Sequence, residues 1–262
     1  TKANVTEKYG YWIHAAVQRW KDHHETYKKL GARPVLFIMA DDFRAELASY
    51  GSSAVTPNLD RLARRSVQFD RAYCQFPLCS PSRASFLTGQ YPHRHGIIDN
   101  TNRSAASHKL ITWPRLLHDA GYDTAFIGKW HMGNDDSPRP GFDSWVSFKG
   151  QGECIDPDLN VNGKNVSTHG YITDLLTDHA VDFLDKRRAR PFCLYLSHKA
   201  IHPNIQQRDD GSVSSGGNDA ELFIPAPRHA RLYKGMTPPR RANYKLPPRN
   251  QPALEQKIEG VP

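Results

Sequence analysis

The chain has 262 residues and a formal net charge of +8. This length is enough for one large α/β domain with a real hydrophobic core. The longest apolar run, residues 35–40, is far shorter than the roughly 20 residues of a membrane-spanning helix. The positive charge suits an anionic substrate, but much of it lies in segments typical of solvated edges, and no nucleic-acid motif accompanies it. The composition therefore argues against a membrane span and against a nucleic-acid partner.

Residues 1–32 differ in pattern from the rest of the chain. Their apolar residues recur at roughly helical spacing, which predicts an amphipathic helix. The residues of this pattern are Ile13, Val17, Trp20 and Tyr27. No signal-peptide pattern with an apolar central region is visible there. We expect an N-terminal helical extension over 1–32, an α/β core over 33–208, and a loop with a Pro- and Arg-rich extended segment over 209–262.

From residue 33 onward, strand and helix patterns alternate. Short apolar segments bounded by turn residues predict strands over residues 35–40, 122–127 and 192–196, and a further strand is expected over residues 67–73. Alternation of strands with helices predicts an α/β fold in which helices cover both faces of a mostly parallel sheet.

Capping residues and stop signals predict the helices. Thr56, Thr112 and Thr168 are expected to open three of them, and a short fourth helix ends at Gly89. The predicted helices cover residues 57–65, 82–88, 112–120 and a long stretch after 168. The last of these carries an apolar stripe made of Ile172, Leu175, Leu176, Phe183 and Leu184.

Polar residues gather where the predicted strands end. Ligands of open α/β sheets bind outside the carboxyl ends of the strands, so these residues are candidates for one site. They are Asp41, Asp42, Cys79, Arg83, Lys129, His131, His198 and His202. Each alone has an ordinary explanation as a cap, a turn residue or a core residue. Together they predict a site that combines carboxylates, a nucleophile precursor, cations and imidazoles.

Cys79 lies close to the start of the predicted helix over residues 82–88. Backbone N–H groups at a helix start favour an anion, and Arg83 adds a cation that can bind an oxyanion through two hydrogen bonds. A lone cysteine beside a helix is ordinarily a buried structural residue. The surrounding residues, Cys79-Ser80-Pro81-Ser82-Arg83 followed by Leu87-Thr88-Gly89, make that explanation weaker.

This run resembles the signature of the type I sulfatases of the alkaline phosphatase superfamily. Gly128-Lys129-Trp130-His131 resembles the second signature of that family, and residues 197–203 resemble the segment that ends in a catalytic histidine, here His202. The resemblance covers about residues 33–233. It implies the mostly parallel, helix-covered sheet of that family, with the smaller C-terminal subdomain missing.

The resemblance also implies the chemistry of the site. In that family a formylglycine-generating enzyme oxidises the cysteine to formylglycine, whose hydrated aldehyde attacks the sulfur of a sulfated glycan or other small molecule. Cys79 would be this nucleophile. Asp41, Asp42 and the modified Cys79 would hold calcium, or alternatively magnesium. A thiol is too soft a ligand for such an ion, whereas the oxygens of the modified residue suit it.

By the same resemblance, the remaining residues bind sulfate and move protons. Arg83 would stabilise the nucleophile and its loop, and Lys129 would bind a sulfate oxygen. His131 would take the proton that triggers sulfate release, and His202 would bind sulfate and protonate the leaving alcohol. These two histidines could exchange roles, and His198 would only touch the substrate.

Part of the family pattern has no counterpart in this sequence. A second pair of metal ligands and a further lysine are expected downstream of His202, and Asn218-Asp219 is too early and in the wrong order. We therefore expect a fragment or a shortened relative. The leading hypothesis is a sulfuric ester hydrolase acting on a sulfated carbohydrate or a related sulfate monoester. The alternatives are a phosphonate or phosphate ester hydrolase of the superfamily, and an inactive fragment that binds sulfated glycans. The resemblance implies a periplasmic, secreted or lysosomal location.

Overall fold

The computed structural model describes residues 31, 33–44, 46–215, 222–237, 239–240, 244 and 246. The chain divides into two compact units, Thr1–Ala226 and Pro227–Pro262, and every predicted site residue belongs to the first. Apart from residue 31, the amphipathic helix predicted over 1–32 lies outside the described residues, as does much of the predicted extended segment. Among the described residues, no helix is both long and apolar enough to cross a membrane.

A six-stranded sheet forms the centre of the first unit, with strand order β1-β6-β2-β3-β4-β5. The first four strands in this order are parallel neighbours, and the last two add an antiparallel hairpin at one edge. The strands are β1 (Val35–Ala40), β6 (Phe192–His198), β2 (Asp123–Gly128), β3 (Ser144–Ser147), β4 (Asp158–Val161) and β5 (Lys164–Ser167). The mostly parallel sheet is thus confirmed, whereas β3, β4 and β5 were not predicted.

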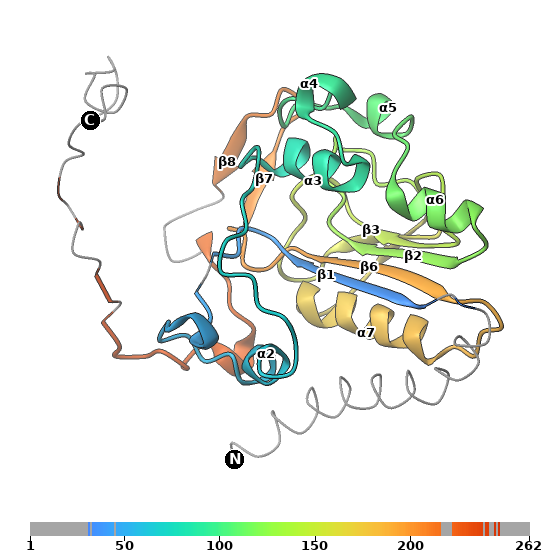
Figure 1. The fold of residues 1–262 in the computed structure, drawn as a ribbon. Coiled ribbons are helices and arrows are strands. Elements are labelled where there is room, and N and C mark those ends of the chain that lie inside the picture. Colours follow the sequence, from blue (N-terminus) through green and yellow to red (C-terminus); the bar gives the residue numbers. More distant parts are fainter. Residues whose placement is uncertain are drawn as a thin grey trace. The chain divides into compact units, whose positions relative to one another are not determined.

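Helices cover both faces of this sheet (Figure 1). One face carries four helices, and the opposite face carries the long helix α7 (Ile172–Asp185). The four helices are α3 (Cys79–Thr88), α4 (Pro92–His95), α5 (Ser104–Ser107) and α6 (Trp113–Asp119). The smaller elements include α2 (Pro57–Ala63), two short 3-10 helices (Ala48–Tyr50 and Pro227–His229), and a separate hairpin of β7 (Ile205–Gln207) and β8 (Val213–Ser215). The predicted sandwich is therefore confirmed.

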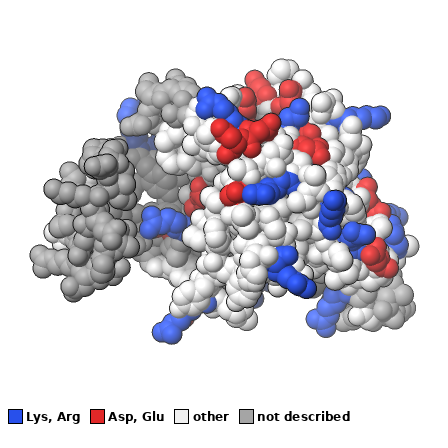
Figure 2. Space-filling model, turned by 90° about the horizontal axis from the view of Figure 1, so that it is seen from above, with Lys and Arg blue, Asp and Glu red and all other residues white. Residues whose placement is uncertain are grey.

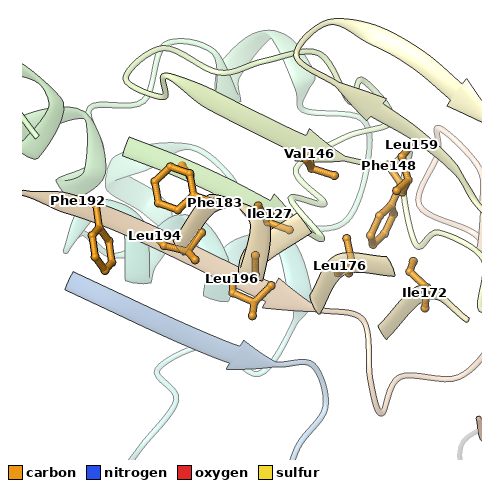
Figure 3. Close-up of a cluster of buried hydrophobic side chains, with 12 residues drawn as sticks. Ile127, Val146, Phe148, Leu159, Ile172, Leu176, Phe183, Phe192, Leu194 and Leu196 are labelled. Atoms are coloured by element: carbon orange, nitrogen blue, oxygen red, sulfur yellow. The ribbon is translucent and has the colours of Figure 1, made fainter. Parts of the chain in front are cut away.

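The two cores follow from the alternation of side chains along β6. Leu194 and Leu196 pack with Ile172 and Leu176 of α7 in one buried cluster (Figure 3). Tyr195 points to the other face and packs with Phe126 in a mainly aromatic cluster. Because side chains alternate strictly along a strand, this register also decides which face Ser197 and His198 belong to.

The prediction of a strand over residues 67–73 was wrong. This segment has no regular secondary structure, and Val67, Phe69 and Tyr73 are largely exposed. Its alternating apolar residues are typical of a half-buried strand, but strand formation depends on pairing with a neighbour, which the local pattern does not encode. Cys79 therefore does not follow a strand.

Several predicted boundaries shift where side-chain contacts override local signals. Helix α2 begins after Thr56 as predicted, but the hydroxyl of Thr56 donates to the carboxylate of Asp60 and accepts from the N–H of Ala48, so it caps no N–H of α2. The hydroxyl of Thr168 donates to the carbonyl of Pro157. As a result, α7 begins only at Ile172. Thr112 does cap α6, since its hydroxyl accepts from the N–H of Arg115 at 3.4 Å.

Three further boundaries matter for the site. Helix α3 begins at Cys79, three residues earlier than predicted, and ends at Gly89 as predicted. Strand β6 continues to His198, so Ser197 and His198 belong to the strand and not to the loop after it. Within the loop predicted after Asp209, β8 forms a short strand because it pairs with β7.

Gly128, the last residue of β2, is expected to tolerate no side chain. Its φ is +123°, and a Cβ would lie 1.8 Å from the carbonyl oxygen of Ser197. We expect Gly128→Ala to lower the free energy of unfolding by about 3 kcal/mol or more, measured by urea denaturation. The matched control is Gly89→Ala, where φ is +67° and no atom lies within 4 Å. It should cost only the strain of a left-handed backbone, about 1–2 kcal/mol. An equal loss of free energy of unfolding in the two variants would contradict the close approach of Gly128 to the carbonyl of Ser197.

Candidate active site

Cys79 is the first residue of α3 and is partly buried. The N–H groups in the first turn of a helix have no partner within the helix. One of them, from Ser80, donates to the side-chain oxygen of Asn100 at 3.0 Å. The hydroxyl of Ser80 donates to the carbonyl of His131 at 2.6 Å. The bond to His131 fixes the start of α3 against the loop that follows β2, and the bond to Asn100 fixes it against the segment between α4 and α5.

Arg83 lies one turn further along α3 and is buried. One terminal nitrogen, Nη1, donates to the carbonyl of Lys129 and to the hydroxyl of Ser197, each at 2.7 Å. The other, Nη2, forms an ion pair with Asp41 at 3.0 Å. The guanidinium group therefore joins α3 to the ends of β1, β2 and β6.

Lys129 follows β2 and is fully buried. Its Nζ contacts the carboxylate of Asp41, donates to Oε1 of Gln151 at 2.6 Å, and lies 4.0 Å from Sγ of Cys79. Its backbone N–H donates to the carbonyl of Ser197 at 2.8 Å, which sets the direction of the side chain. An ammonium group is thus held beside the proposed nucleophile position.

Burial and mutual attraction set the charges of this cluster. Burial alone would raise the pKa of Asp41, but Arg83 and Lys129 outweigh it and hold that pKa well below its usual range. Burial lowers the pKa of Lys129, and Asp41 opposes that shift. Burial raises the pKa of the Cys79 thiol despite the nearby Lys129. Unmodified Cys79 therefore stays a neutral thiol, which is a poor nucleophile.

His202 follows β6 and faces the same cluster. Its Nδ1 lies 2.9 Å from the carbonyl of Pro203, and because a carbonyl only accepts, Nδ1 must carry the proton. Its Nε2 lies 3.6 Å from a carboxylate oxygen of Asp42. Burial lowers the pKa of His202, which favours the neutral ring with a free electron pair on Nε2.

His131 is buried beside the cluster and contacts Gln207 through Nε2 at 2.9 Å. Its Nδ1 is buried and has no hydrogen-bond partner. Burial, with a smaller contribution from Lys129 and Arg83, lowers its pKa well below the usual value.

His198 is not brought to this cluster. Alternation along β6 places it on the side of Leu194 and Leu196, which faces α7. Burial lowers the pKa of His198 to about 4, and Asp174 of α7 partly opposes the shift. Its predicted contact with substrate is untested, and its neighbour Ser197 is the residue that points into the site.

Two of the three predicted metal ligands, Asp41 and Cys79, lie close enough to bind one metal ion together with His202, and the third predicted ligand, Asp42, is not part of this group. Asp41, Cys79 and His202 each place one donor atom within 4.8 Å of the others, and this is the group found among the described parts of the chain. A carboxylate, a thiol and an imidazole form too soft a set for calcium or magnesium, which prefer oxygen ligands. With oxygen in place of sulfur at position 79, and with Asp42 close to His202, the set fits a hard ion better.

Three contributors to the site were missed from the sequence. Gln151, Gln207 and Asn100 all bond to site residues. Isolated amides carry no spacing signal, and their partners come from distant segments, so no local pattern could have identified them.

Asp41→Asn is expected to leave two buried cations without a counter-ion. The free energy of unfolding at pH 7 should fall by about 3–5 kcal/mol, measured by urea denaturation without divalent cations. Because folding lowers the pKa of Asp41, the stabilisation is present above its unfolded value of 3.8 and is lost as the pH falls through the folded value. The difference in free energy of unfolding between wild type and Asp41→Asn should therefore become smaller in acid. The control is Asp119→Asn, at a more exposed carboxylate. If the difference in free energy of unfolding between wild type and Asp41→Asn did not change with pH, Asp41 would not be the counter-ion of the two cations.

Comparison with known proteins identifies the family. A family model described as sulfatase matches residues 33–236. The N-acetylglucosamine-6-O-sulfatase of Bacteroides thetaiotaomicron is 37% identical over 215 residues, covering 80% of this chain and 34% of that protein. The N-acetylgalactosamine-6-sulfatase of Canis lupus familiaris is 33% identical over 212 residues, covering 65% of this chain and 40% of that protein. The chain thus spans well under half the length of either relative.

Solved structures agree with these matches. One, a protein in complex with its substrate D-glucosamine-2-N,6-O-disulfate, aligns with a TM-score of 0.68 and 36% identity over 80% of this chain and 40% of that chain. Another, in complex with a neocarrahexaose, aligns with a TM-score of 0.61 and 33% identity over 68% of this chain and 47% of that chain. This chain belongs to the sulfatase family.

Proposed function

We propose that this chain carries the nucleophile position and the sulfate-binding lysine of a sulfuric ester hydrolase that acts on a sulfated carbohydrate. The observation that carries the proposal is the buried pair of cations, Lys129 and Arg83, beside Cys79. The names of the relatives support a substrate in which an amino sugar carries sulfate at O6.

The cations counter the main obstacle to this reaction, which is the negative charge of the substrate. A sulfate monoester is negatively charged and repels nucleophiles, so fixed positive charge lowers the barrier most where water is excluded. Nζ of Lys129 needs no reorganisation, because Asp41 and Gln151 already hold it 4.0 Å from Sγ of Cys79. Arg83 contributes indirectly, since it fixes the first turn of α3 against β2 and β6.

Figure 2 shows acidic and basic side chains interspersed on one face, without a continuous basic band. That face therefore offers no basic stripe for a long sulfated glycan. The solvated basic edges expected from the sequence stay a prediction.

Cys79 requires modification in this proposal. Its thiol is neutral because burial raises its pKa. Formylglycine at this position, made by a formylglycine-generating enzyme, supplies an oxygen nucleophile and oxygen ligands. Calcium or magnesium held by Asp41 and Asp42 would polarise a sulfate oxygen.

Proton transfer falls to the two histidines. His202 is bound through Nδ1 to the carbonyl of Pro203, so Nε2, which holds the free electron pair of the neutral ring, would first take up a proton and then give it to the leaving alcohol. His131 is neutral and buried, which suits a group that accepts a proton. A periplasmic, secreted or lysosomal location remains a prediction from the family.

Modification of Cys79 is tested by mass spectrometry of the peptide that carries it, after co-expression with a formylglycine-generating enzyme. We expect the mass of an aldehyde in place of the thiol, and release of sulfate from N-acetylglucosamine-6-sulfate. Cys79→Ala should abolish turnover, and Lys129→Ala should lower kcat by about 10²–10³.

The matching 6-phosphate ester, tested side by side, is the control for reaction class. A thiol that stays wholly unmodified would contradict the proposed nucleophile. Faster release of phosphate would favour the phosphate ester hydrolase. Retention on a sulfated glycan by the modified protein, without any turnover, would favour the glycan-binding alternative.

A further inference from the structure

Two glutamines connect the buried Lys129 to His131. Nζ of Lys129 donates to Oε1 of Gln151, and Nε2 of Gln151 donates to Oε1 of Gln207 at 3.0 Å. The same Oε1 of Gln207 lies 2.9 Å from Nε2 of His131. A chain of hydrogen bonds therefore runs from an ammonium group to an imidazole through two neutral amides.

The direction of this chain is fixed at both ends. An ammonium group only donates, so Gln151 must present its oxygen to Lys129 and its NH₂ group to Gln207. Independently, the NH₂ group of Gln207 donates to the backbone carbonyl of Asn100, which only accepts. Both anchors orient Gln207 with its oxygen toward His131.

An amide oxygen only accepts, so Nε2 of His131 must be the protonated nitrogen. In a neutral ring this leaves the electron pair on Nδ1. That Nδ1 is buried and has no hydrogen-bond partner. Buried polar atoms are nearly always paired, so an unpaired acceptor on a buried ring near the charges of Lys129 and Arg83 suggests a functional role.

We propose that Gln207, oriented by Asn100 and Gln151, is a positioning residue that holds His131 as the Nε2–H tautomer and so reserves Nδ1 as its proton-accepting atom. The part played by Nδ1 in catalysis rests on the proposed function, whereas the tautomer itself does not.

Backbone hydrogen bonds hold Gln207 in place. It ends β7, which pairs with β8, so the backbone on which it stands belongs to a closed hairpin. The hairpin is tied to the segment containing Asn100, because the N–H of Asn102 donates to the carbonyl of Asp209 at 2.9 Å. The neighbouring Gln206 is exposed and bonds to Glu153 instead.

The test is the ring ¹⁵N spectrum of histidine-labelled full chain, in which protonated and unprotonated ring nitrogens resonate far apart. The signals of His131 are assigned by their loss in His131→Asn. Wild type should show Nε2 protonated and Nδ1 unprotonated. Gln207→Glu keeps an acceptor and should preserve this tautomer, whereas Gln207→Lys offers only donors and should move the proton to Nδ1. Gln206→Lys adds the same charge on the exposed side of β7 and should change nothing.

A wild-type ring protonated at Nδ1 would overturn the proposal, as would a Gln207→Lys protein that keeps Nε2 protonated. Amide spectra show whether each variant is folded. Should Gln207→Lys fail to fold, Gln207→Met removes the acceptor, and the Nε2 proton should exchange with water about fivefold faster or more. If the Nε2 proton of Gln207→Met exchanged no faster than that of wild type, the proposal would also be overturned.

Turnover separates this inference from the proposed function. In the modified protein, Gln207→Lys should lower kcat far more than Gln207→Glu does, with little change in KM. The tautomer is read without turnover, so an absence of sulfatase activity in every variant would overturn the proposed function and not the positioning by Gln207.

Discussion

The contact of one buried carboxylate with two buried cations is the constraint on which the site depends. Asp41 faces both Lys129 and Arg83, and these three residues come from the ends of β1 and β2 and from α3. Neither cation could remain buried without it, because an unpaired charge in the interior is costly. Next to Cys79 the two cations lower the pKa of the thiol, whereas Asp41 and Asp42 raise it. The interaction that holds the strand ends together thus also fixes the charges around position 79.

Local signals account for the part of the fold that local physics determines. The apolar runs of β1, β2 and β6 predict parallel strands, and Thr112 and Gly89 mark real helix ends. The predicted burial is confirmed for β2 and β6 but was wrong for β1, where Leu36 and Ile38 are 47% and 58% exposed. The predicted strand over residues 67–73 fails for the opposite reason. Val67, Phe69 and Tyr73 alternate with polar residues as in a half-buried strand, although Arg71 interrupts the pattern, but a strand exists only where a neighbour pairs with it, and that depends on distant residues.

In the candidate site, too, some features could be predicted from local sequence and others depend on distant residues. Motif residues such as Asp41 and Lys129 could be predicted because strand ends converge in parallel sheets. Whether a residue near a strand end points into the site depends on one residue of register. Strand β6 continues to His198, so Ser197 reaches Arg83 while His198 faces α7. An error of one residue in a strand boundary therefore exchanges a site residue for one that faces the opposite side of the sheet.

The two histidines differ in how their protons are placed. In His202 the carbonyl of the next residue holds Nδ1–H, a contact that needs only the local backbone. In His131 the tautomer depends on Gln151 and Gln207, which lie 20 or more residues away in sequence. A contact made within two residues is kept wherever the turn forms, whereas a contact relayed through two amides can be altered by substituting either one. The tautomer of His131, and with it the direction of proton transfer, is therefore the more easily changed feature of the site.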